Sequence, residues 1–158
     1  MIKILFICHG NICRSPMAEF ILKDMVRKRN ISEKFYIESA ATSTEEIWNG
    51  VGNPVYPPAK EILSQHGIDC SGKRARQIKP EDYEVFDLLI AMDDNNLRNM
   101  ARVWPKDAEH KIHKMLEYAD EDRNVADPWY TGDFQKTWDD IYRGCVGLLQ
   151  KLDSKMDH

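Results

Sequence analysis

Short apolar runs alternate with segments of helical periodicity along the chain, and this alternation restricts the fold more than any other feature. Residues 3–7, 34–40 and 87–92 ("KILFI", "KFYIESA" and "DLLIAM") have the composition of strands. Residues 111–118 fit a strand or a helix, and their place in the order favours a fourth strand. Strands that alternate with helices form a mostly parallel sheet covered on both faces. We therefore expect an α/β fold, with a four-stranded parallel sheet flanked by helices on both faces.

Turn and cap residues indicate where the helices between these strands begin and end. The first helix is expected to open with Ser15 as its N-cap and Pro16 at its first position. Residues 44–58 are rich in Gly, Pro and Asn and predict a loop. A second helix is expected from about Pro58, with Gly67 as its stop.

Two more helices complete the pattern. One is expected to follow an N-cap at Asp93 or Asp94 and to end before Pro105. The last is expected to start near Asp133 and to bury an apolar stripe with helical spacing. The stripe consists of Phe134, Trp138, Ile141, Tyr142, Cys145, Leu148, Leu149 and Leu152.

Length and charge exclude several classes of protein. The 158 residues suggest a single domain over 1–158, and no linker, repeat or low-complexity segment interrupts them. A formal net charge of −4 argues against a nucleic-acid-binding protein, and the short basic stretch at 73–79 ("KRARQIK") is better explained as a solvated loop. No apolar run is long enough for a membrane span or a signal peptide, so we expect a cytoplasmic protein without a membrane partner. A monomer is the default expectation.

The four cysteines are Cys8, Cys13, Cys70 and Cys145. An even number allows two disulfides, but a chain without an export signal more often keeps its thiols reduced. No His/Cys spacing suggests a metal site, so neither a metal nor a cofactor is expected.

The stretch "CHGNICRSP" at residues 8–16 joins the first strand to the first helix. Gly10 and Asn11 tolerate left-handed backbone angles, which allow consecutive amides to turn inward and surround an anion. The N-terminus of the helix that follows adds a positive field. Because ligands bind at the carboxyl ends of parallel strands, we expect a phosphate-binding loop here, between strand 1 and helix 1.

Cys8 and Arg14 have the residue types that phosphoryl transfer needs at the two ends of such a loop. Arg14 can hold two phosphate oxygens through its planar guanidinium. The same positive field favours the thiolate form of Cys8, which can attack phosphorus, and the Ser15 hydroxyl can bond that thiolate. Each of these residues alone is more often structural. Their combination after a strand favours an anion site.

A leaving oxygen also needs a proton, and Asp127 in "ADPWYTGDF" is the best candidate donor. Pro128 restricts the backbone beside it, and Trp129 and Tyr130 offer apolar surface that disfavours an ionised carboxyl. From the residues alone, an Asp-Pro pair that simply initiates a turn is an equally good explanation.

These segments together resemble the low-molecular-weight protein tyrosine phosphatase family. "CHGNICRSP" matches the family signature Cys-x-Gly-Asn-Ile-Cys-Arg-Ser-Pro, and "DPWY" is similar to the loop that carries the general acid. Residues 66–78 and 86–97 are also similar to family segments, so the resemblance covers essentially the whole chain. It implies hydrolysis of phosphotyrosine in proteins, and of small aryl phosphates, through a cysteinyl-phosphate intermediate, with phosphate and vanadate as inhibitors.

The resemblance also implies a role for each matching residue. Cys8 is the nucleophile, Arg14 the phosphate clamp and Asp127 the general acid and later the base. Asn11 and Ser15 hold the shape of the loop. The phosphate-binding residues are Cys8, His9, Gly10, Asn11, Ile12, Cys13, Arg14 and Ser15.

Other matching positions have a structural explanation beside the functional one. His66 corresponds to a histidine that supports the loop through hydrogen bonds, or it is a solvated residue at a helix end. Trp48 and Trp129 correspond to aromatic walls of the substrate cleft, although Trp48 could equally be packing of a loop. Tyr130 is a second aromatic residue of the cleft.

Two residues of the signature loop, Cys13 and His9, and Trp129 of the loop that carries Asp127 lead to further expectations. Cys13 is expected to form a reversible disulfide with Cys8 that protects the nucleophile, unless it is only a wall residue. His9 and Trp129 depart from the commoner family residues. A partly charged His9 is expected either to favour acidic residues beside the phosphotyrosine or to slow the turnover of apolar substrates.

Two relatives of the same scaffold supply alternatives. Thioredoxin-coupled arsenate reductases need two further cysteines close together, whereas Cys70 and Cys145 are far apart in sequence. Protein arginine phosphatases tend to have Thr at the position of Ile12, and an apolar Ile12 favours an aryl ring. A non-catalytic phosphate-binding module is disfavoured because Cys8, Arg14 and Asp127 are all present.

Overall fold

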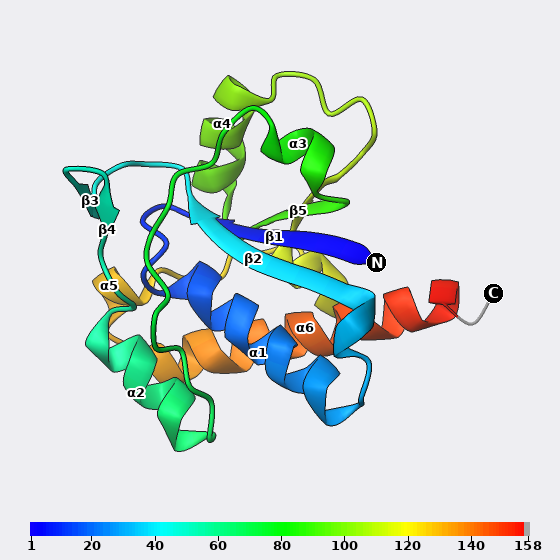
Figure 1. Cartoon of the computed structure of the whole chain (residues 1–158), viewed down its shortest axis with the longest axis horizontal. Coiled ribbons are helices and arrows are strands. Elements are labelled where there is room, and N and C mark those ends of the chain that lie inside the picture. Colours follow the sequence, from blue (N-terminus) through cyan, green and yellow to red (C-terminus); the bar gives the residue numbers. More distant parts are fainter. Residues whose placement is uncertain (157–158) are drawn as a thin grey trace.

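The computed structural model describes residues 1–156 and confirms the expected α/β fold (Figure 1). Four parallel strands form the main sheet in the order β2–β1–β5–β6. Their bounds are Ile2–Cys8 for β1, Phe35–Ala41 for β2, Leu88–Ala91 for β5 and Ile112–Lys114 for β6. Asp157 and His158, which the expected domain includes, lie outside the described residues.

Alternate side chains of β1 point to the two faces of the sheet, and different helices cover each face. Ile4 and Phe6 are buried in the larger core, with α1, α2 and α6, whereas Leu5 and Ile7 are buried in a second core with residues of α4 (Figure 1). A strand buried on both faces explains why residues 4–7 ("ILFI") form a continuous apolar run. The helices are α1 (Arg14–Lys28), α2 (Pro57–Gln65), α3 (Asp82–Val85), α4 (Asp94–Val103) and α6 (Phe134–Met156).

Several short elements lie where the sequence predicts a loop or a strand. The loop 44–58 contains a small hairpin, β3 (Ile47–Trp48) and β4 (Val51–Gly52), and the 3-10 turn η1 (Ser32–Lys34) and the single turn α5 (Pro128–Thr131) are further additions. Only three residues of 111–118 form a strand. The remainder is the 3-10 helix η2 (Met115–Ala119), which packs against α6. A Cβ at Gly147 would lie 1.8 Å from the Tyr118 carbonyl oxygen, so this close approach requires glycine.

The helix ends differ from the prediction at one functional position. Ser15 is not an N-cap, because α1 already begins at Arg14 and its cap residue Cys13 makes no side-chain cap. The Ser15 hydroxyl is instead bonded within the loop that precedes the helix. Asp93 rather than Asp94 caps α4, in a reciprocal capping box with Asn96.

The loop at 8–14 lies at the switch point of the sheet. β1 has β2 on one side and β5 on the other, so the chain leaves the carboxyl end of β1 where its neighbours diverge. Ligands of open parallel sheets bind at such a position. Within residues 1–156, no helix has the length and apolar character needed to cross a membrane.

Candidate active site

One cavity lies over the loop between β1 and α1. Residues from this loop form its floor, and the segments at 45–46 and 127–130 form its walls. Its lining residues are Cys8, His9, Gly10, Ile12, Cys13, Arg14, Glu45, Glu46, Asp127, Trp129 and Tyr130. The structure therefore brings together segments that are more than 100 positions apart in the sequence.

The backbone of the loop is shaped for an anion. Asn11 has φ 60°, the left-handed conformation, whereas Gly10 does not. Gly10 instead provides space, because a Cβ there would lie 3.1 Å from Cγ of Glu46. In the described part of the chain, the N–H groups of residues 12 to 15 donate to no protein acceptor, so they are available at the positive end of α1.

Cys8 lies at the base of this loop, and its Sγ atom has two hydrogen-bonding neighbours. The Asn11 backbone N–H donates to Sγ at 3.3 Å, and Ser15 Oγ lies 3.0 Å from Sγ. The residue is 3% exposed and lines the cavity. Donors directed at sulfur stabilise the thiolate over the thiol.

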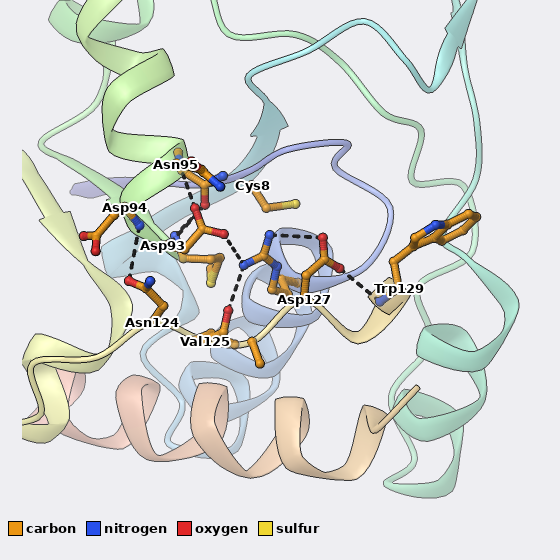
Figure 2. Close-up of polar contacts among 12 residues, drawn as sticks. Cys8, Asp93, Asp94, Asn95, Asn124, Val125, Asp127 and Trp129 are labelled. Carbon is orange, nitrogen blue, oxygen red and sulfur yellow. Dashed lines mark hydrogen bonds and ion pairs between the residues drawn. The ribbon is translucent and has the colours of Figure 1, made fainter. Parts of the chain in front are cut away.

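The Arg14 side chain is buried, with only 3% of it exposed, and hydrogen bonds fix its guanidinium group. Its Nη1 atom donates to Asp93 Oδ2 at 2.7 Å and to the Val125 carbonyl at 2.8 Å (Figure 2). Burial lowers the pKa of Arg14, but the charges of Cys8 and Asp93 outweigh burial, and the net pKa is raised. The guanidinium is therefore a permanent, oriented cation beside Cys8.

Asp127 reaches the same cavity from the loop before α5. Its Oδ2 atom lies 3.5 Å from Arg14 Nη2, and its Oδ1 atom accepts the Trp129 N–H at 3.0 Å (Figure 2). The Asp-Pro pair does initiate a turn, since Asp127 is the N-cap of α5 with Pro128 at its first position. The turn at Asp127 is therefore compatible with a functional role, because the same turn brings Asp127 to the cavity.

Cys13 differs from Cys8 although both line the cavity. Burial, together with the charges of Cys8 and Asp127, raises the pKa of Cys13 well above its ordinary value. All four cysteines are free thiols. The environment of Cys13 therefore favours its neutral thiol form.

The mouth of the cavity is more acidic than the sequence suggested. His9 Nε2 lies 2.9 Å from Glu45 Oε2, and the Asn53 side-chain amide donates to Glu46 Oε2 at 2.7 Å. The Glu45 carboxylate beside His9 repels acidic residues, which weakens the expectation that His9 attracts them. No periodicity or motif indicates these glutamates, because they lie in the turn before β3 and become lining residues only through the fold.

Of the three aromatic residues expected in the cleft, Trp129 and Tyr130 line the cavity and Trp48 does not. Trp129 lines the cavity and packs on Tyr56, with ring centroids 4.8 Å apart, and Tyr130 is 85% exposed at the rim. Trp48, expected to wall the cleft, is not among its lining residues. Its side chain lies on the β3–β4 hairpin and is 73% exposed.

His66, expected to support the loop, does so through no hydrogen bond in residues 1–156. Its ring stacks on Trp138 of α6, with centroids 3.8 Å apart and 7° between the planes. It lies at the C-terminal end of α2, which packs against α6. The side chains that do support the loop are Ser39 and, through it, Glu19, together with Asp93 for Arg14.

The described residues contain no group of three or more His, Cys, Asp or Glu side chains placed to hold a metal ion. The donors of the cavity are instead a guanidinium, backbone amides and hydroxyls. Such a set recognises oxyanions.

Known proteins with the same pattern identify the family. Residues 3–158 match the family model described as low molecular weight phosphotyrosine protein phosphatase. YfkJ of Bacillus subtilis is 40% identical over 157 residues, with 96% of each chain covered, and the human low molecular weight phosphotyrosine protein phosphatase is 38% identical over 154 residues, with 94% of each covered.

Solved structures agree with the sequence relatives. The crystal structure of YfkJ superposes with a TM-score of 0.92 at 36% identity and covers 98% of this chain and 96% of its own. That of a Drosophila arginine phosphatase has a TM-score of 0.84 at 32% identity, with 96% and 97% covered. The chain therefore belongs to the low molecular weight phosphotyrosine protein phosphatase family, which confirms the expected family and the expectation of an enzyme.

Proposed function

We propose that this protein hydrolyses phosphotyrosine in proteins, and small aryl phosphates, through a cysteinyl-phosphate intermediate. The observation that carries the proposal is the convergence of Cys8, Arg14 and Asp127 on one cavity whose floor is an anion-binding loop. A nucleophile, a phosphate clamp and a proton donor are the three groups that the reaction needs.

In the first step, the Cys8 thiolate attacks phosphorus, a sulfur–phosphorus bond forms and the bond from phosphorus to the tyrosine oxygen breaks. The loop amides and Arg14 hold the phosphoryl oxygens, and protonated Asp127 donates its proton to the leaving phenolate. In the second step, a water molecule attacks phosphorus while Asp127 takes its proton. The sulfur–phosphorus bond breaks, and inorganic phosphate and the Cys8 thiolate are produced.

The position of Asp127 in the cavity supports this role. Its carboxylate is shared between Arg14 and the Trp129 amide, and it faces the cavity. A phosphate dianion over the loop competes with Asp127 for the Arg14 guanidinium and disfavours a second negative charge beside it.

The proposal includes regulation and inhibition. Cys13 lies with Cys8 in the cavity and is proposed to form a reversible disulfide with it under oxidation. Phosphate and vanadate are proposed to compete with substrate, because both present tetrahedral oxygens to the loop. We propose a monomer in the cytoplasm, in keeping with the net charge of −4.

The first experiment compares the wild-type enzyme with Cys8→Ser on p-nitrophenyl phosphate and on a phosphotyrosine peptide, in the presence of EDTA. Turnover is expected in the wild type and absent in the variant. Cys70→Ser is the matched control, because Cys70 is a buried thiol outside the cavity. Turnover that survives Cys8→Ser would overturn the mechanism.

Phosphoarginine is the second candidate substrate, because Glu45 and Glu46 place carboxylates at the mouth, where a guanidinium would be attracted. Ile12 favours an aryl ring instead. Initial rates on matched phosphotyrosine and phosphoarginine peptides decide between them, and faster hydrolysis of phosphoarginine would replace the first choice. Arsenate reduction is disfavoured because Cys70 and Cys145 are buried in the core and outside the cavity.

A further inference from the structure

The turn that carries Asp127 has few polar attachments to the rest of the fold. Its backbone hydrogen bonds are local, such as those from the N–H groups of Tyr130 and Thr131 to the Asp127 carbonyl. Among residues 1–156, the one polar partner of the Asp127 side chain outside this turn is Arg14, at 3.5 Å. The phosphate of the proposed substrate competes for the same guanidinium. Asp127 therefore needs a second attachment to stay over the cavity once a phosphate is bound.

The ring of Tyr56 supplies such an attachment. It packs on the ring of Trp129 in α5, with centroids 4.8 Å apart and 52° between the planes, and tilted pairs of this kind are favourable. Trp129 is half exposed, and no other aromatic ring of residues 1–156 packs on it. The Trp129 N–H in turn donates to Asp127 Oδ1 at 3.0 Å. A single residue thus separates Tyr56 from the carboxyl group.

Tyr56 is itself fixed to the phosphate-binding loop. Its backbone N–H donates to the Ile12 carbonyl at 2.9 Å, and Tyr56 is the residue that precedes α2. Its ring also stacks on Phe134 at the start of α6, with centroids 6.0 Å apart and 28° between the planes. Both rings pack against a small cluster that contains the buried side chains of Ile12 and Cys13. Tyr56 therefore contacts the loop that holds the phosphate and the turn that holds the acid.

We infer that Tyr56 is a positioning residue: it connects the phosphate-binding loop to the turn of Asp127 and, through Trp129, holds the Asp127 carboxyl over the cavity. Tyr56 does not line the cavity, so it acts through other residues and not on the substrate. The inference rests on the proposed function, because it takes Asp127 as the general acid. It adds that the acid is placed from outside the cavity, by the segment before α2.

The test compares kcat/KM on phenyl phosphate, which has a poor leaving group, with kcat/KM on p-nitrophenyl phosphate, which has a good one. This parameter includes the step in which the leaving group departs, and a general acid matters most when that group is poor. Tyr56→Leu is expected to lower kcat/KM about tenfold on phenyl phosphate, a part of the ~10²–10⁴ that a general acid contributes, and less than about twofold on p-nitrophenyl phosphate. A merely structural role would lower both values alike.

Three further variants assign the effect to the ring and to the acid. Tyr56→Phe keeps the ring and is expected to behave as the wild type. Tyr142→Leu is the matched control, because it removes a tyrosine ring that stacks on Trp138 outside the cavity, and it is expected to leave the ratio of the two kcat/KM values unchanged. In an Asp127→Asn background, Tyr56→Leu is expected to change this ratio no further, because the acid is already absent.

Hydrogen–deuterium exchange followed by mass spectrometry tests the attachment without any substrate. The N–H groups of Tyr130, Thr131 and Gly132 are hydrogen-bonded within the turn, so their exchange reports its opening. Exchange is expected to be about 2- to 10-fold faster in Tyr56→Leu, the factor that the loss of one aromatic pair produces. Tyr142→Leu is expected to leave it unchanged.

Equal losses on the two substrates, or no loss, in folded Tyr56→Leu would overturn the inference, as would a loss in Tyr56→Phe as large as in Tyr56→Leu. Thermal unfolding followed by circular dichroism reports the folded state of each variant. If Tyr56→Leu does not fold, Trp129→Leu removes the other ring from a half-exposed position, and the same ratio decides. Absence of wild-type turnover would refute the proposed function instead, and the exchange measurement would then decide whether Tyr56 holds the turn.

Discussion

Replacement of Asp93 by Asn is expected to impair catalysis although Asp93 does not line the cavity. Its two carboxylate oxygens serve different partners: Oδ2 accepts from Arg14 Nη1 at 2.7 Å, and Oδ1 accepts from the Asn96 backbone N–H at 2.7 Å. An asparagine has one acceptor oxygen and one amino group. It can keep the bond to Arg14 or the helix cap, but not both.

The magnitude follows from the bond that is lost. A hydrogen bond to a charged group contributes about 1.5–3 kcal/mol, and a tenfold rate change corresponds to about 1.36 kcal/mol, so kcat/KM is expected to fall roughly 10- to 100-fold if Arg14 is released. If the cap is lost instead, stability falls by about 1 kcal/mol. That loss lowers Tm by about 2–4 °C in a chain of this size.

The assay measures kcat/KM on p-nitrophenyl phosphate together with the melting temperature. Asp94→Asn is the matched control, since Asp94 pairs with Lys114 at the surface and not with Arg14. Asp93→Ala removes both bonds and is expected to show both effects at once. A folded Asp93→Asn protein with kcat/KM within about twofold of the wild type and an unchanged Tm would refute the reasoning.

Three other changes test separate parts of the structure. Asp127→Asn is expected to lower kcat by about 10²–10⁴, most for poor leaving groups, and equal losses for good and poor leaving groups would contradict its role as acid. Cys13→Ala is expected to leave Cys8 open to irreversible oxidation, so that mass spectrometry after peroxide finds Cys8 sulfinic acid, whereas the wild type forms the disulfide. At Asp140, burial opposes ionisation, but hydrogen bonds from two arginines outweigh it and hold the pKa below its usual value. The ionised form of Asp140 therefore stabilises the fold above pH about 4. In denaturant unfolding at pH 7, the free energy of unfolding of Asp140→Asn is expected to be about 1.5–3 kcal/mol lower than that of the wild type. This difference is expected to shrink as the pH falls.

The elements that were predictable from sequence are those whose signals are local. Residues 4–7 ("ILFI") are buried on both faces of the sheet, so their uninterrupted apolar character indicates a strand of a parallel sheet. Residues 115–119 lack such a signal. Their apolar side chains pack against α6, and the close approach of the Tyr118 carbonyl to Gly147 is a tertiary contact that no local pattern indicates.

In the candidate site, the signature loop was recognisable because its residues are consecutive, but its supports were not. Ser39, Glu19 and Asp93 come from β2, α1 and the start of α4, and each has an ordinary residue type for its element. Their roles depend on the register of β2 against β1 and on the cap of α4. Ser15 illustrates the same limit, because a Ser-Pro pair before a helical pattern normally predicts a cap.

The charges around the loop indicate that neutral hydrogen-bond donors contribute much of the anion binding. Arg14 already faces the carboxylates of Asp93 and Asp127 as well as the Cys8 sulfur, so its single positive charge is offset before a phosphate arrives. A phosphate dianion brings two more negative charges to the same place. The backbone N–H groups of residues 12–15 must then supply a large share of the stabilisation. Since their direction depends on the left-handed Asn11 and its hydrogen bonds, the shape of the loop is as important to the chemistry as the arginine itself.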